Sequence, residues 1–334
     1  MKIQDFNTKK KIFLIAEIGN NHEGSLKIAK KLIFLAKKNG ANAVKFQYIN
    51  PEKLVNKKIF PDKINFLKKI CLNIDQFHEL EAYSKKIGII FLCSIFDYTK
   101  INEFKKIVPA FKIASGDNNL INTINHVVKF NKPILLSTGM LKNDEIKTVI
   151  NKINIKKNQL MSKLCVLHCV SNYPLKNKDI NLQKINYLKK LNVTIGYSDH
   201  SIGIQACIVA ASLGARVIEK HFTIDHNFSD FRDHQLSMNP EQLKILSKSL
   251  KEVNEILGKN INAIPASEKN NISSNRRGIY SKIEISKGQK IKNNNIILLR
   301  PEGKLSASNL KKILGKRVKK DIKELEELTL DKII

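Results

Sequence analysis

The sequence lacks any long run of apolar residues. No window approaches the roughly 18 uninterrupted apolar residues that a membrane-spanning helix needs, and the first residues, MKIQDFNTKKK, lack the apolar core of a secretory signal. We therefore expect a cytoplasmic protein that does not act at a membrane.

Cysteine is scarce as well. Five cysteines, an odd number, are scattered along the 334 residues. All but Cys71 lie in apolar stretches, where a free cysteine behaves as a small hydrophobic residue. A disulfide framework is therefore not expected.

Arginine makes up only six of the 59 basic residues, although the formal net charge is +29. A charge of this size ordinarily indicates nucleic acid or another polyanion as a partner. Arginine, however, is the residue best suited to paired hydrogen bonds with phosphate and guanine, and the lysines are spread along the chain rather than clustered. We therefore expect no nucleic-acid partner, and polyanion binding stays only as an alternative function.

What the sequence does contain is a regular alternation of short β-branched runs and longer helical patterns. The segment 25–40 is one such helix, with Ser25 as a cap at its start and Gly40 at its end, and 201–215 is another, with Ser201 as the cap. Eight strand–helix units predict an α/β fold, the TIM (β/α)8 barrel, with catalytic groups at the carboxyl ends of its strands. The eight expected strands are 12–19, 42–48, 89–96, 110–115, 133–139, 163–170, 194–200 and 216–223.

The texture of the sequence changes after Gly258. We predict a barrel domain over 1–258, closed by a last helix near 240–257. Residues 259–275 are polar and without periodicity, which is typical of a linker. Residues 276–334 contain short strands and turns and predict a small, mainly β, domain.

Polar residues gather near the carboxyl ends of the predicted strands, where charge is expensive to bury unless it is paired or functional. Ammonium groups and hydroxyls in a concave site suit a phosphate or carboxylate ligand; the alternative is that the lysines extend their amines to solvent. Glu17 is a candidate for proton transfer, with a structural ion pair to Lys45 as the alternative. The residues concerned are Glu17, Lys45, Gln47, Ser94, Lys112, Ser115, Ser137, His168, Ser198, His200, Glu219 and His221.

His200 and His221 end the seventh and eighth predicted strands, which lie about 4.8 Å apart in a closed barrel. Two imidazoles on neighbouring strand ends can converge on one metal ion. With no thiolate partner the site would be open, which suits Mn²⁺, Mg²⁺ or another divalent ion that accepts oxygen ligands better than structural zinc. The alternative is a local hydrogen bond for each histidine.

Eight motifs in the same order resemble those of the N-acetylneuraminate (sialic acid) synthase family, including the legionaminate and pseudaminate synthases. They are IAEIGNNHEGSLKIAKKLI, AVKFQ, FKIASGD, PILLSTGM, LHCVSNYP, IGYSDHSIG, EKHFT and SMNPEQL. The end segment, with RRGIY, ISKGQ and LLRPEG, resembles the antifreeze-like (SAF) domain of these enzymes. The resemblance covers nearly the whole chain.

The resemblance implies a transferase of sialic acid biosynthesis. It would condense phosphoenolpyruvate with an N-acylated hexose, such as N-acetylmannosamine or a 2,4-diacetamido-6-deoxy hexose, to a nine-carbon 2-keto-3-deoxy acid and phosphate. The divalent metal of the family, usually Mn²⁺ (Mg²⁺ or Co²⁺ would also serve), would be held by His200 and His221, and Glu17 would transfer a proton. Phosphoenolpyruvate would be held by Lys45, Ser94, Lys112, Ser115, Ser137 and Ser198.

The resemblance also implies sugar contacts from Gln47, Tyr173 and Asp233. Arg300 matches an arginine that reaches the partner's site, which implies a domain-swapped homodimer. By the same resemblance Asp117 and Ser171 would also bind the sugar. Asp117 stands where many relatives have Glu, and Ser171 where some have Asn, so the acceptor sugar is less determined than the reaction. A 3-deoxy-aldulosonate phosphate synthase, acting on a phosphorylated sugar, is the alternative enzyme, but it would not account for the end domain.

Overall fold

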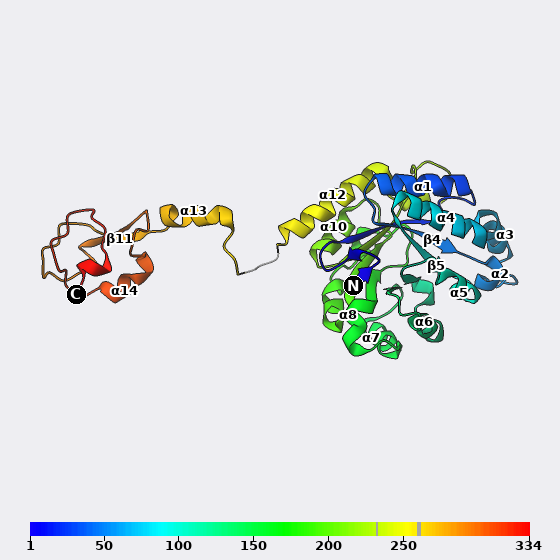
Figure 1. Cartoon of the computed structure of the whole chain (residues 1–334), viewed down its shortest axis with the longest axis horizontal. Coiled ribbons are helices and arrows are strands. Elements are labelled where there is room, and N and C mark those ends of the chain that lie inside the picture. Colours follow the sequence, from blue (N-terminus) through cyan, green and yellow to red (C-terminus); the bar gives the residue numbers. More distant parts are fainter. Residues whose placement is uncertain (232, 259–261) are drawn as a thin grey trace. The chain divides into compact units, whose positions relative to one another are not determined.

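The structure, a computed structural model, describes residues 1–231, 233–258 and 262–334, which form two compact units, Met1–Gly258 and Lys259–Ile334. In the first unit eight parallel strands close into a barrel in the order β10-β3-β4-β5-β6-β7-β8-β9 (Figure 1). The predicted TIM barrel is confirmed, and each strand lies within its predicted run. The strands are β3 (Phe13–Gly19), β4 (Ala43–Tyr48), β5 (Ile90–Ile95), β6 (Phe111–Ile113), β7 (Ile134–Ser137), β8 (Leu164–Cys169), β9 (Thr194–Asp199) and β10 (Val217–His221).

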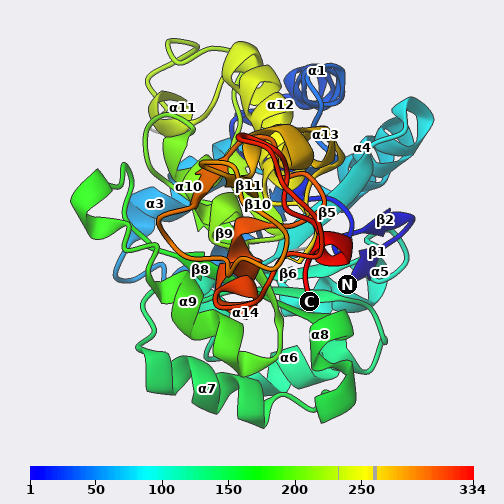
Figure 2. The same cartoon turned by 90° about the vertical axis from the view of Figure 1, so that its left-hand side faces the viewer.

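Helices surround the barrel, and in both Figure 1 and Figure 2 α6, α7 and α8 lie together along one side of it. Ser25 caps α1 as predicted, since its hydroxyl accepts a hydrogen bond from the amide of Ile28 at 3.3 Å. The helices of this unit are α1 (Leu26–Lys38), α2 (Pro51–Leu54), α3 (Pro61–Ile70), α4 (Ile74–Ile87), α5 (Ile101–Phe104), α6 (Ile121–Val128), α7 (Asn143–Lys152), α8 (Leu160–Lys163), α9 (Lys184–Leu188), α10 (Gln205–Ser212), α11 (Asp233–Leu236) and α12 (Pro240–Ile256).

The prediction that Ser201 caps the next helix is wrong. Helix α10 begins only at Gln205, with Ile204 as its N-cap, and the Ser201 hydroxyl instead donates to Asp199 at 2.8 Å. A hydrogen bond to a carboxylate is stronger than one between neutral groups. The bond to Asp199 therefore holds the serine in the turn after β9.

Alternate residues along each strand separate two apolar layers. Outward-facing residues such as Leu14, Val44 and Ile218 pack under the helices. The inward-facing residues fill the lower barrel: Phe13, Ile15, Ala43, Leu92, Ala110, Leu135, Cys165, Leu167 and Val217. Because this apolar plug occupies the amino ends of the strands, the polar inward residues are left at the carboxyl ends.

A short amino-terminal hairpin closes the lower end of the barrel. Strands β1 (Lys2–Ile3) and β2 (Phe6–Asn7) pair antiparallel, and Met1 and Ile3 are buried in the same cluster as the inner barrel residues. The rings of Phe6 and Phe13 lie 4.8 Å apart. The hairpin thus covers the apolar end opposite the polar mouth.

The second unit has its own apolar core, built from residues such as Ile279, Ile296 and Val318. Strands β11 (Gly278–Ser281) and β12 (Ile296–Leu299) pair antiparallel, and isolated bridges and the helix α14 (Leu310–Ile313) complete it. The segment 259–275, predicted to be a linker, contains a helix, α13 (Ala266–Asn275). No helix in the described residues of either unit is long and apolar enough to cross a membrane.

Candidate active site

The strand register brings the predicted polar residues together at the mouth of the barrel. Glu17 lies opposite both Lys45 and His221, because β3 is flanked by β4 and β10. Ser198 lies opposite Glu219 on β10, and Ser94 opposite Lys112 on β6. Residues far apart in the sequence are therefore direct neighbours around one ring.

A buried network of two carboxylates and two ammonium groups forms the floor of this mouth. The Lys45 Nζ lies 2.8 Å from Glu17 Oε2 and 3.8 Å from Glu219 Oε1, and the Lys112 Nζ lies 3.5 Å from Glu219 Oε1. Lys45 also donates to the Ser94 hydroxyl at 3.1 Å. All four charges are buried, so each depends on the others to stay ionised.

The network shifts the pKa values of the two carboxyl groups in opposite directions. Burial raises the pKa of Glu17, and the opposing effect of Lys45 does not cancel it. Burial also acts to raise the pKa of Glu219, but Lys112 and Lys45 outweigh it and lower that pKa to about 2. Glu219 is therefore a fixed anion, whereas Glu17 is the group suited to carry a proton.

Above this floor lies an inner pocket of about 280 Å³. The hydroxyls of Ser137 and Ser171 are buried in it without a hydrogen-bond partner among the described residues, so they remain available to a ligand. Gly139 lies against the hydroxyls of Ser115 and Ser171, where any larger side chain would collide with both. Lysines and free hydroxyls together make this a pocket for a small anion.

His200 and His221 lie side by side at the rim of the inner pocket, with ring centroids 5.5 Å apart. The His200 Nδ1 is 2.8 Å from the carbonyl oxygen of Val170, which leaves its Nε2 for a ligand. The His221 Nδ1 is buried with no hydrogen-bond partner among the described residues. Burial lowers the pKa of His221 to about 4, so the ring is neutral at pH 7 and is in the form that binds metal.

The donor set fits an open divalent site. Two imidazoles lie side by side, and no group of three or more His, Cys, Asp or Glu in the described part of the chain is arranged to hold a metal. The remaining coordination positions would therefore belong to water or substrate oxygens, which favours an ion such as Mn²⁺ over structural zinc.

Behind the two histidines, on the outer face of the sheet, a buried ion pair links their strands. The Lys220 Nζ lies 2.7 Å from Asp199 Oδ2 and donates to the carbonyl oxygen of Ser201 at 2.6 Å. Asp199 also accepts hydrogen bonds from Tyr197 and from the amide and hydroxyl of Ser201. Asp199 thus joins β9 to β10 from the outer face through Lys220, a partner that the sequence did not indicate.

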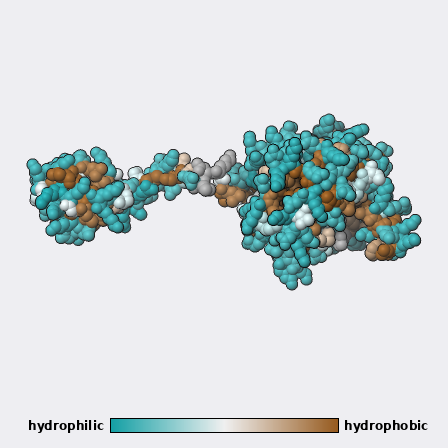
Figure 3. Space-filling model, turned by 90° about the horizontal axis from the view of Figure 1, so that it is seen from below, coloured by the Kyte–Doolittle hydropathy of each residue, from teal (hydrophilic) through white to brown (hydrophobic). Residues whose placement is uncertain are grey.

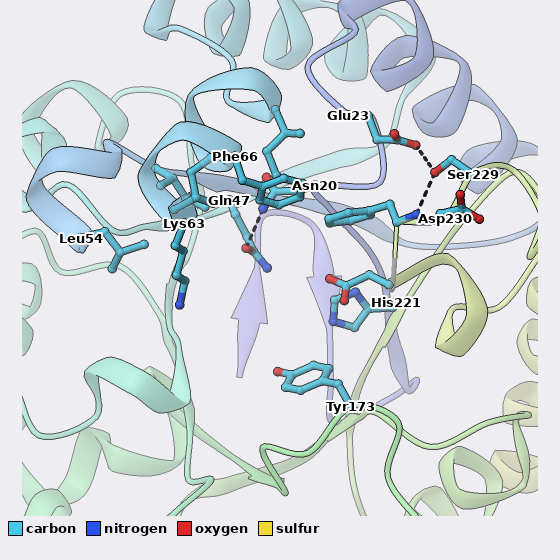
Figure 4. Close-up of a pocket in the computed structure, with 15 residues that line it drawn as sticks. Asn20, Glu23, Gln47, Leu54, Lys63, Phe66, Tyr173, His221, Ser229 and Asp230 are labelled. Carbon is cyan, nitrogen blue, oxygen red and sulfur yellow. Dashed lines mark hydrogen bonds between the residues drawn. The ribbon is translucent and has the colours of Figure 1, made fainter. Parts of the chain in front are cut away.

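An outer pocket of about 790 Å³ opens from the inner one, with Gln47, Tyr173 and His221 lining both. Figure 4 shows Leu54, Lys63 and Phe66 on one side and Glu23, Ser229 and Asp230 on the other. Gln47 spans the junction, since its amide donates to Glu17 Oε1 at 2.9 Å and its oxygen accepts from Asn20 at 3.3 Å.

A loop after β10 forms the polar side of the outer pocket. Glu23 Oε1 accepts from the Ser229 hydroxyl at 2.7 Å and lies 2.9 Å from His234 Nε2. The Nδ1 of His234 is 2.6 Å from the Thr223 hydroxyl. These bonds tie the turn carrying Glu23, which precedes α1, to the loop that carries Ser229 and to helix α11, which begins at Asp233.

The family model described as the NeuB family matches residues 32–262, and the SAF domain model matches 276–334. The chain belongs to the NeuB family. It is accordingly an enzyme, a synthase that condenses phosphoenolpyruvate to form nonulosonic acids. NeuB family enzymes are generally metal-dependent.

Named members of the NeuB family match this chain over nearly their full length. The N,N'-diacetyllegionaminic acid synthase of Campylobacter jejuni is 34% identical over 95% of this chain and 98% of its own. The pseudaminic acid synthase of the same organism is 34% identical over 97% of both chains. The crystal structure of the N-acetylneuraminic acid synthetase from Leptospira borgpetersenii, in complex with citrate, is 32% identical, with a TM-score of 0.75 over 81% of this chain and 94% of that one.

Within this NeuB family barrel most of the predicted site residues are brought together. The inner pocket is lined by Glu17, Lys45, Gln47, Ser94, Lys112, Ser115, Ser137, Ser171, Tyr173, Ser198, His200 and His221, and Asp233 lines the outer one. Asp117 lines neither pocket, and its carboxylate is hydrogen-bonded to Tyr98. Arg300 is exposed in the second unit. His168 faces outward and lies 2.7 Å from the Ile180 carbonyl oxygen.

Sequence reasoning missed several residues of the two pockets. The sequence marks Glu219 only as a polar residue near a strand end, although it is the anion shared by both lysines. Glu219 lies two residues before His221 on β10, and this spacing indicates that both side chains face the inside of the barrel. Asn20 and Phe66 come from a loop and a helix outside the strands, so no strand periodicity could indicate them.

Proposed function

We propose that this enzyme condenses phosphoenolpyruvate with an unphosphorylated N-acylated hexose and water. The products are a nine-carbon 2-keto-3-deoxy acid and phosphate, with cleavage of the C–O bond of phosphoenolpyruvate. The acceptor is N-acetylmannosamine or a 2,4-diacetamido-6-deoxy hexose. The observation that carries the proposal is the junction of a cationic, hydroxyl-lined inner pocket with a larger outer pocket at Gln47, Tyr173 and His221.

Phosphoenolpyruvate occupies the inner pocket. Lys45 and Lys112 supply the ammonium groups for its carboxylate and phosphate. The hydroxyl of Ser137, which has no hydrogen-bond partner among the described residues, donates to an anionic oxygen. Ser94, Ser115 and Ser198 complete the set of hydroxyls.

The metal belongs at the outer edge of this pocket. A divalent ion, Mn²⁺ by preference, would be held by His200 and His221 and would polarise the aldehyde of the acceptor. Tyr173 supports this placement, because its ring centroid lies 4.1 Å from that of His200 and 6.1 Å from that of His221. The tyrosine therefore lines the space in which the sugar must meet the metal.

Glu17 serves in proton transfer. Its carboxylate is fixed between Lys45 and the Gln47 amide, beside the residues of both pockets. Since burial raises its pKa, it exchanges a proton more readily near neutral pH than a surface glutamate does. Gln47, Ser171, Tyr173 and Asp233 contact the sugar, and the sugar contact of Asp117 stays a prediction.

The charge of the outer pocket argues for an acceptor without phosphate. Among its described lining residues, Glu23, Asp230 and Asp233 are acidic and only Lys63 is basic. A chain of formal charge +29 thus has an acidic outer pocket. A phosphorylated aldose would be repelled by these carboxylates, which disfavours the 3-deoxy-aldulosonate phosphate synthase alternative. The same carboxylates would repel a polyanion, which disfavours the polyanion-binding alternative.

The reaction is tested by measuring phosphate release from phosphoenolpyruvate with a panel of acceptors, with and without Mn²⁺. We expect Mn²⁺-dependent release only when an unphosphorylated N-acyl-hexosamine is present. Equal release with a phosphorylated aldose alone would instead support the alternative enzyme.

The metal assignment has its own test. His200→Ala and His221→Ala should each abolish Mn²⁺ dependence and turnover while the circular dichroism spectrum stays that of the wild type. A fully active double variant would refute the assignment.

A further inference from the structure

The apolar side of the outer pocket is the feature that the reaction itself does not require. It consists of Leu54 at the end of α2, Phe66 on α3 and Phe231 in the loop after β10, which we call the apolar shelf. The rings of Phe66 and Phe231 stack with centroids 6.0 Å apart and planes at 23°. Figure 4 shows Leu54 and Phe66 on the same side of the pocket.

The shelf is a supported surface rather than a few stray side chains. The buried residues Ile49, Leu67 and Ile70 form a small separate core, against which Phe231 packs. Yet Leu54 is 38% exposed and Phe66 45% exposed. Figure 3 shows apolar surface at the end of the barrel unit where Figure 1 places α2 and α3. Apolar surface kept in water at the edge of a pocket indicates an apolar ligand group.

The geometry of the reaction decides which part of the acceptor reaches this shelf. The aldehyde carbon has to lie next to His200 and His221, at the inner end of the outer pocket, to meet phosphoenolpyruvate. The carbons farthest from the aldehyde, C4 to C6, therefore extend outward. There they lie between the shelf and the acidic side formed by Glu23 and Asp230.

We infer that the apolar shelf selects an acceptor with methyl groups on its distal carbons, a 2,4-diacylamino-6-deoxy hexose, in preference to N-acetylmannosamine. The inference rests on the proposed function and assigns the acceptor within it. The C6 methyl and the methyl of a C4 acylamino group would cover Phe66 and Leu54. N-acetylmannosamine presents two hydroxyls at these carbons, which gain little from an apolar surface.

The experiment compares kcat/KM for the two acceptors at saturating phosphoenolpyruvate, using the full-length chain with Mn²⁺. Because one methyl or methylene contact changes kcat/KM by about 10-fold to 200-fold, we expect the wild type to prefer the diacylamino sugar by at least about 10-fold. In Phe66→Ser this preference should fall by about five-fold or more, through a higher KM for the diacylamino sugar.

Phe60→Ser is the matched control. Phe60 is 57% exposed, immediately precedes α3, and is not among the residues that line the pocket. Its substitution removes the same side chain from the same segment and should leave the preference unchanged. Leu54→Asn provides a second shelf variant if Phe66→Ser does not fold, with the same fall in preference expected.

The possible results separate the two proposals. Turnover of both sugars with equal efficiency, or a preference for N-acetylmannosamine, overturns the assignment of the shelf but leaves the condensation intact. An equal loss with both acceptors in Phe66→Ser also overturns it, because a merely structural shelf would not discriminate. Turnover of neither sugar refutes the proposed function itself.

Discussion

At the scale of single residues, the neighbours of each buried charge at the mouth of the barrel determine its protonation state. Glu17 and Glu219 are both buried glutamates near Lys45, yet Glu219 is also 3.5 Å from Lys112 and accepts from Ser198 at 2.9 Å. This additional neutralisation makes Glu219 a permanent anion and leaves the exchangeable proton to Glu17. The sequence indicated that both residues were unusual, but only the barrel register shows which lysines they share.

His22 makes a prediction about acid stability that does not involve the reaction. Its ring is buried, and burial lowers its pKa to about 4, against an ordinary value of 6.5. The unfolded chain therefore binds a proton that the folded chain rejects. The contribution of this residue to the free energy of unfolding is complete above pH 6.5 and is lost as the pH falls towards 4. The loss reaches about 2.5 kcal/mol at pH 4.5.

The measurement is urea unfolding of the wild type and of His22→Gln at pH 7 and pH 4.5. The variant cannot take up the proton, so its free energy of unfolding should fall by about 2.5 kcal/mol less than that of the wild type over this interval. An identical loss in both proteins would contradict the burial of a neutral His22.

At the scale of elements, β9 and β10 hold the two histidines at a fixed separation. Lys220 lies opposite Asp199 in the strand register, so their ion pair on the outer face fixes the alignment of the inner face, where His200 and His221 lie. Tyr197 and Ser201 bind the same carboxylate. We therefore regard the ion pair as a support for the metal site.

Lys220→Met should weaken Mn²⁺ binding by about 10-fold to 100-fold, since it removes an outer support of the ligands. It should also lower the free energy of unfolding by about 3 to 5 kcal/mol, because Asp199 is left as an unpaired buried charge. The measurement is Mn²⁺ titration by electron paramagnetic resonance, paired with urea unfolding.

Ile218→Ala is the control for this prediction. Ile218 is fully buried on the outer face of the same strand, and its truncation costs about 2 to 5 kcal/mol without touching the ion pair. If Lys220→Met binds Mn²⁺ as tightly as Ile218→Ala does, the ion pair stabilises the barrel but does not position the histidines.

The sequence predicted an element best where its apolar residues form a recognisable pattern. All eight strands were found, because each is a short apolar run between helical patterns. The amino-terminal hairpin was not, since two strands of two residues show no alternation. Helix α13 was also missed, because none of its residues is buried and it has no apolar face to recognise.

At the scale of the whole molecule, the prediction of a homodimer depends on Arg300. The SAF unit has a core of its own and is compact by itself, so it can serve the barrel of a partner. Arg300 is exposed in this unit, which suits a residue whose ligand lies elsewhere. The barrel residues of the site, by contrast, are all contained in Met1–Gly258.

Arg300→Ala should weaken sugar use while leaving the barrel folded. Mixing it with His221→Ala after subunit exchange should restore about a quarter of the wild-type activity per site, because half of the dimers are mixed and each of these has one complete site. Activity of the mixture no greater than the sum of its parts would show that the unit acts on its own barrel.

The bridging oxygen of phosphoenolpyruvate reports most directly on the proposed reaction. The substrate is labelled with ¹⁸O between C2 and phosphorus and incubated with Mn²⁺ and the diacylamino hexose. We predict that the label leaves entirely with inorganic phosphate, while the nine-carbon keto acid takes its C2 oxygen from water. Label retained in the keto acid would mean cleavage of the P–O bond and would contradict the proposed condensation.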